Sequence, residues 1–114
     1  MKLTFQKPPA LNKLYGTNKW GGKYLLKEGR DWKETALWII KTVKVENWDS
    51  PVSLTVNLYT CRHQDNDSVL KVLQDTLQEG KVFTDDYWIY ELHVFKHRCK
   101  KKDERVEVEV LKLS

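Results

Sequence analysis

The segment from residue 64 to residue 86 carries the side chains best suited to chemistry. Asp65 and Asp67 lie two residues apart just before an expected helix, and Lys71 follows Asp67 by four residues. Residues two apart in an extended segment project from the same face, and residues four apart share one side of a helix. Asp86 follows the helix and a turn. If the strand that begins at Asp86 neighbours the strand before Asp65, three carboxylates gather near a lysine.

Such a group of carboxylates would favour Mg²⁺, or Mn²⁺ as a possible substitute, over soft metals. A bound divalent ion activates water against a phosphodiester, and a lysine orients that water or offsets charge in the transition state. The structural alternative is that Asp67 or Ser68 caps the helix while Asp65 lies in a turn. An EF-hand is excluded, because its glycine and its terminal glutamate are missing. By itself, the segment leaves a metal site and a helix cap both open.

The surrounding hydrophobic pattern predicts the elements that position these residues. Strands are expected over residues 2–5, 51–61, 87–96 and 105–113, and amphipathic helices over 32–45 and 68–79. Asp31 and Glu34 form a capping-box-like start for the first helix, and Gly80 ends the second. Residues 8–16 read as an ordered loop, and the glycine-rich residues 16–30 as a mobile loop or hairpin. The order β-α-β-α-β-β predicts an α/β (α+β) fold of two layers, with two main helices on a mixed sheet.

Length and composition bound the class of protein. The 114 residues suit a single domain spanning 1–114, and 40% hydrophobic with 32% charged residues is typical of a folded soluble chain. No apolar run approaches the roughly 18 residues of a membrane span, and no signal-peptide pattern opens the chain. We therefore expect a cytoplasmic protein with no membrane partner, in which Cys61 and Cys99 are reduced.

Charge is unevenly distributed along the chain. The net charge is +4, with +6 in residues 1–33, −5 in residues 34–95 and +3 in residues 96–114. Basic arms on both sides of an acidic middle suit a polyanionic substrate held by its phosphates. Solubility alone is an equally good explanation of the charge.

Three motifs together add a more specific hypothesis. Residues 8–15 read PPALNKLY, residues 65–67 read DND with Lys71 four positions on, and residues 83–86 read FTDD. The combination resembles the RusA-like Holliday junction resolvases, small endodeoxyribonucleases of bacteria and their prophages. The resemblance covers nearly the whole chain. Gln64 and Ser68 depart from it, because the family usually has arginine before the first aspartate and asparagine after the second.

The resemblance implies a role for each matching residue. Asp65, Asp67 and Asp86 would be the metal-binding and catalytic carboxylates, Lys71 the catalytic lysine, and Asp85 a neighbour with a lesser role. It also implies a Mg²⁺-dependent homodimer, without a small-molecule cofactor, that resolves four-way junctions by paired symmetric nicks in DNA recombination and repair. The alternative is a catalytically silent or differently specific branched-DNA-binding protein of the same fold.

Most candidate DNA contacts lie in the basic arms, and Arg62 lies in the acidic middle. The candidates are Asn12 and Tyr15 of the early motif, with the basic side chains Lys13, Lys19, Lys23, Arg62, Lys100, Lys101 and Lys102. The basic run over residues 96–102 fits a contact with the DNA backbone and a solvated turn equally well. Trp20 either stacks at a junction opening or anchors the core.

The two cysteines raise one further alternative. Cys61 and His63, with His97 and Cys99, would form a zinc site if their strands were adjacent, although the spacings are not those of zinc fingers. A simply buried cysteine is the commoner outcome.

Overall fold

The computed structural model describes residues 1–62 and 66–113, apart from the side chains of Leu11, Asn12 and Asn66. In chain order its elements are β1 (Lys2–Phe5), α1 (Leu11–Leu14), β2 (Tyr15–Thr17), β3 (Lys23–Leu25), α2 (Lys27–Lys41), β4 (Val52–Thr60), α3 (Asn66–Glu79), the 3-10 turn η1 (Asp86–Trp88), β5 (Ile89–Arg98), the 3-10 turn η2 (Lys101–Asp103) and β6 (Arg105–Lys112). The α+β class with a mixed sheet and two main helices is confirmed. Within the described residues, no helix is long and apolar enough to cross a membrane.

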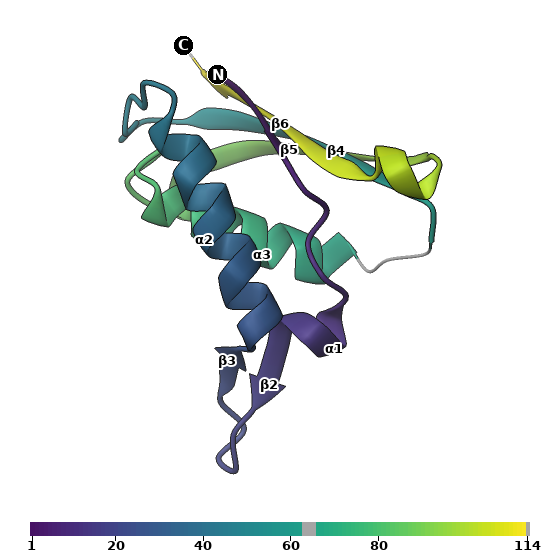
Figure 1. The fold of residues 1–114 in the computed structure, drawn as a ribbon. Coiled ribbons are helices and arrows are strands. Elements are labelled where there is room, and N and C mark those ends of the chain that lie inside the picture. The colour runs from purple at the N-terminus through teal and green to yellow at the C-terminus, as the bar shows by residue number, and fades with distance from the viewer. Residues whose placement is uncertain (63–65, 114) are drawn as a thin grey trace.

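The main sheet has the strand order β1-β6-β4-β5. β4 and β5 run parallel, with Val52 opposite Ile89 and Thr60 opposite Arg98, whereas β1·β6 and β4·β6 are antiparallel. A parallel pair needs a crossover connection, which here contains α3. Figure 1 shows α2 and α3 on one side of this sheet.

The core lies between the sheet and the two helices. Leu54, Val56 and Leu58 of β4 are buried at alternate positions, as expected of a strand with one covered face. α3 adds four buried hydrophobic residues, Val69, Val72, Leu73 and Leu77, while Leu70 is only half-buried. Its apolar stripe is therefore centred on the valines as much as on the leucines.

The first long helix begins earlier than its capping pattern predicts. α2 starts at Lys27 after Leu26, which makes no side-chain cap, and Asp31 instead pairs with Lys27 at 3.1 Å within the helix. A Cβ on Gly29 would lie 2.7 Å from the carbonyl oxygen of Leu14, so glycine allows this turn to pack closely on α1. The capping-box prediction at Asp31 is wrong, because this tertiary contact extends the helix.

The segment predicted as a loop or hairpin is a hairpin formed by β2 and β3. At its tip, the side-chain oxygen of Asn18 accepts hydrogen bonds from the backbone N–H of Trp20 and of Gly22, both at 2.9 Å. Gly21 has a φ of 81°, which a side chain would make costly. The hairpin projects away from the main sheet, beyond the helices (Figure 1). Residues 8–16, expected to be a loop, also contain the single turn α1.

The turn that precedes Asp85 and Asp86 is held by a short bridge between Trp48 and Phe83. The backbone N–H of Trp48 donates to the Val82 carbonyl at 3.1 Å, and that of Thr84 donates to the Trp48 carbonyl at 2.8 Å. Phe83 is fully buried. Asp86 consequently begins η1 rather than a strand, and β5 starts three residues later, at Ile89.

Packing of α3 on the sheet predicts a large stability difference between two leucines. Leu73→Ala should lower the free energy of unfolding by about 2–5 kcal/mol, because Leu73 is fully buried and its truncation leaves a cavity. Leu111→Ala is the matched control, since Leu111 is 49% exposed and should cost below about 1 kcal/mol. Urea unfolding followed by circular dichroism measures both. Equal losses would contradict this packing.

Candidate active site

One face of α3 carries charged side chains at regular four-residue spacing. Asp67, Lys71 and Asp75 are all exposed, while Val72 and Thr76 beside them are buried. Each four-residue step rises about 6 Å along the axis, so Lys71 lies midway between two carboxylates. Asp75 was missed by the sequence analysis, although its position four residues after Lys71 is a signal that would have found it.

Tyr15, at the base of the hairpin, meets this face of α3. The Lys71 ammonium nitrogen lies 5.3 Å from the centre of the Tyr15 ring, within the range of a cation–π contact. Burial raises the pKa of Tyr15, and the negative charge of Asp75 raises it further. The structure therefore joins the early motif to the predicted catalytic lysine.

Carboxylates crowd together where the chain leaves α3. The backbone N–H of Asp86 donates to the side-chain oxygen of Gln78 at 3.0 Å, and Asp85 caps η1 by accepting from the Tyr87 N–H at 2.9 Å. The pKa of Asp86 is raised, first by a hydrogen bond with the Asp85 side chain, then by burial and by the charges of Asp85 and Asp75. A cation placed here would relieve that repulsion.

Asp67 and Asp86 lie at opposite ends of α3 within one chain. Gln78, which contacts Asp86, is eleven residues beyond Asp67, or about 16 Å along the helix axis. β5 does neighbour β4, but the two are parallel, so Asp86 precedes the start of β5 at one end of the sheet while Asp67 follows the end of β4 at the other. Asp65 lies outside the described residues.

Two observations bear on whether a metal fits. Among residues 1–62 and 66–113, no three His, Cys, Asp or Glu side chains are grouped closely enough to hold a metal ion. The donors available on and beside α3, Asp67 at one end and Asp75, Asp85 and Asp86 at the other, are all carboxylates, as a hard divalent cation requires. The chemistry of the donors fits such an ion, whereas a complete set of ligands is not present in the described part of one chain.

Comparison with known proteins bears on the whole chain. The family described as Endodeoxyribonuclease RusA matches residues 6–111. The chain belongs to the RusA family. No curated protein matches the sequence. Membership assigns the chain to the endodeoxyribonucleases and agrees with the family resemblance of the motifs around Pro8, Lys71 and Asp86.

The basic residues expected to contact DNA in this RusA-family chain fall at three places. Arg62 is exposed just after β4. Lys13, Lys19 and Lys23 are exposed on α1 and the hairpin, and Lys100, Lys101 and Lys102 are exposed around η2. Asn12 lies in α1, and its side chain is outside the description. Trp20 is 80% exposed, with the Lys19 ammonium 4.5 Å from its ring centre. The alternative that Trp20 anchors the core is therefore wrong.

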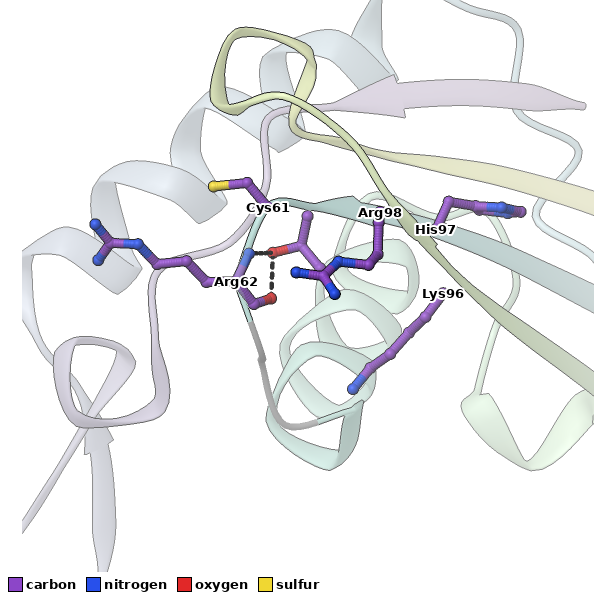
Figure 2. A pocket seen from close by; sticks show the side chains of 6 residues that line it. Cys61, Arg62, Lys96, His97 and Arg98 are labelled. Atoms are coloured by element: carbon purple, nitrogen blue, oxygen red, sulfur yellow. Dashed lines mark hydrogen bonds between the residues drawn. The ribbon is translucent and has the colours of Figure 1, made fainter.

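The zinc alternative finds no support in the described residues of this RusA-family chain. The ring nitrogen Nε2 of His97 lies 2.8 Å from the side-chain oxygen of Asn57, and the ring stacks on Tyr59 at 4.5 Å. Figure 2 shows His97 directed away from Cys61. His63 lies outside the described residues.

The crowding at Asp86 predicts a pH-dependent stability. A raised folded-state pKa means that the folded protein binds the proton more tightly than the unfolded chain. Stability from the protonated form is therefore present below the ordinary pKa of aspartate and is lost as pH rises through the raised value. Without metal ions, Asp86→Asn should melt higher than the wild type at neutral pH, and the gain should vanish at acid pH.

Thermal melts in EDTA between pH 3 and 8 measure this difference. Asp49→Asn, which removes the same charge from an exposed carboxylate outside the cluster, is the control and should show no comparable trend. A wild type that gains stability over Asp86→Asn with rising pH would contradict the prediction.

Proposed function

We propose that this chain is a divalent-metal-dependent, structure-selective endonuclease that cuts four-way DNA junctions by paired symmetric nicks. It would act in the cytoplasm, in DNA recombination and repair, with Mg²⁺ as the metal and Mn²⁺ as a possible substitute. The observation that carries the proposal is the exposed face of α3, where Lys71 lies between Asp67 and Asp75 and beside Tyr15 in a RusA-family chain.

Asp65, Asp67 and Asp86 are the proposed metal ligands, and Asp75 joins them as a neighbouring carboxylate. A divalent ion held there would supply an activated water and charge neutralisation at the scissile phosphate. Lys71 would offset negative charge on that phosphate in the transition state. Tyr15 packs against the lysine and so restricts where its ammonium can lie.

The same geometry supports a homodimer as part of this proposal. Asp86 is held beside Gln78, about 16 Å along the helix axis from Asp67, and this favours a metal shared between two chains over one bound by Asp67 and Asp86 of the same chain. A second copy with its α3 antiparallel to the first would bring Asp67 of one chain near Asp86 of the other, and two such sites would serve two symmetric cuts. The unpaired edge of β5 offers exposed Tyr90, Leu92 and Phe95 to such a contact.

The hairpin would hold the branch point. Trp20 is presented on a tip braced by Asn18, among lysines that attract the phosphates. An exposed indole would stack on the base faces that are uncovered at the centre of an open junction, whereas a linear duplex covers both faces of each internal base pair.

Cleavage of labelled four-way junctions tests the proposed activity. With Mg²⁺ the wild type should nick two opposing strands at symmetric positions, and EDTA should abolish this. Asp67→Asn and Lys71→Gln should each lower the rate by roughly 10²–10³, the cost of removing one group that stabilises the transition state. Asp49→Asn controls for the charge change.

Two results would count against this function. Junction binding without cleavage under any divalent metal would favour the catalytically silent alternative. Cleavage that survives both EDTA and Asp67→Asn would exclude the proposed site.

Replacement of Trp20 tests the role of the hairpin separately. Trp20→Ala should weaken junction binding roughly 5–150-fold, since base stacking is worth about 1–3 kcal/mol, and should leave duplex binding nearly unchanged. Fluorescence anisotropy in EDTA measures both affinities. Trp38→Ala, which removes another exposed indole from α2, and Trp20→Phe, which keeps an aromatic ring, should bind almost as the wild type does. Equal losses on junction and duplex would argue against stacking.

A further inference from the structure

A hollow of about 270 Å³ lies at the carboxyl ends of the parallel strands β4 and β5. Its lining residues are Thr60, Cys61, Arg62, Lys96, His97 and Arg98. The hollow lies at the end of the sheet from which the chain passes on to α3, opposite the end at which Asp86 lies. Lys96 and Arg98 belong to the basic run over residues 96–102, and neither takes part in the proposed catalytic site or in the hairpin.

Lys96 and Arg98 project to the same side of β5. They are two residues apart on a strand, in the row that includes Val94, which packs partly against the core. They therefore lie on the side of the sheet that the helices cover, and both are exposed because β5 is the edge strand. Figure 2 shows the side chains of Lys96 and Arg98 extending in a similar direction. His97 is directed the opposite way, and Arg62 points away from both of them.

The wall of the hollow is braced by Glu104. Its carboxylate accepts hydrogen bonds from the Cys61 N–H at 3.0 Å, from the Thr60 hydroxyl at 3.3 Å and from the Lys7 ammonium at 2.9 Å. The bond from the Cys61 backbone, followed by that from Lys7, lowers the pKa of Glu104 to about 2. Because Lys7 pairs with this carboxylate, the positive charge of the hollow is not cancelled by it. The single hydrogen of the Thr60 hydroxyl is shared between Glu104 and the Arg62 carbonyl, which lies 2.7 Å away (Figure 2).

We propose that this hollow is a phosphate seat, a site that holds one backbone phosphate of bound DNA with Arg98 and Lys96 as its principal contacts. A guanidinium presents paired N–H donors that match phosphate oxygens, and the ammonium adds a compact charge. This inference rests on the proposed function and deepens it. A phosphate held here would anchor the DNA strand at the end of the sheet where α3 begins, close to Asp67.

Binding measurements without cleavage test the seat. In EDTA, log K for a four-way junction falls linearly with log salt concentration, and each lost phosphate contact should reduce the slope by about 0.9 on duplex arms. We expect a loss of about one such contact in Lys96→Gln, in Arg98→Gln and in the double variant. The double variant loses no more than the single ones because both side chains hold the same phosphate. The control pair, Lys44→Gln with Lys112→Gln, removes equal charge from exposed positions outside the hollow.

Neutral methylphosphonate substitutions locate the phosphate and distinguish a DNA phosphodiester from a free-anion site. The substitutions are placed singly along one DNA strand of the junction. At one position the substitution should weaken junction binding by the wild type but not by the Lys96→Gln/Arg98→Gln variant. Thermal melts establish that the variants are folded. The proposed seat would be overturned if the variants had the same salt slope as the control pair. It would also be overturned if no methylphosphonate position weakened binding of the wild type alone.

The seat and the proposed activity fail in different ways. A wild type that binds junctions and shows the slope change, but never cleaves, would retain the seat and refute the nuclease activity. Cleavage with an unchanged slope would refute the seat alone. Failure of the wild type to bind any DNA would refute both.

Discussion

The parallel pairing of β4 with β5 is the constraint on which the rest of the structure depends. Parallel neighbours require a connection that crosses the sheet, and α3 lies in that crossover. The ends of α3 are thereby tied to opposite ends of the sheet. Asp67 comes to lie where β4 finishes, and Asp86 where β5 is about to start. Strand direction thus places these carboxylates near opposite ends of α3, and the Trp48–Phe83 bridge holds the turn that leads to Asp86.

Burial of one face of α3 orients the chemical groups on the other. Leu73 and Leu77 are fully buried against the core, which sets the rotation of the helix about its axis. With 3.6 residues per turn, that rotation presents Asp67, Lys71 and Asp75 together to solvent. Core packing and the proposed catalysis are therefore two consequences of one periodic pattern.

Charge is arranged so that the ends of the sheet differ in sign. Carboxylates gather beside Asp86, whose pKa is raised by a hydrogen bond with the Asp85 side chain, then by burial and by the charges of Asp85 and Asp75, so that this end favours a bound cation or proton. At the other end, Lys7 neutralises Glu104, and Lys96 and Arg98 line the hollow. A polyanion would thus be attracted to one end and a divalent cation to the other, with Lys71 between them.

The sequence by itself determined the strands, the two long helices and the spacing of Lys71 from Asp67, because hydrophobic periodicity is a local property. It did not determine where α2 begins, since close packing of Gly29 on Leu14 overrides the cap expected at Asp31. Nor did it place Trp20 on an exposed tip or Asp75 beside Asp86. Strand direction and contacts between distant segments are properties of the folded chain, and only the tertiary structure decided them.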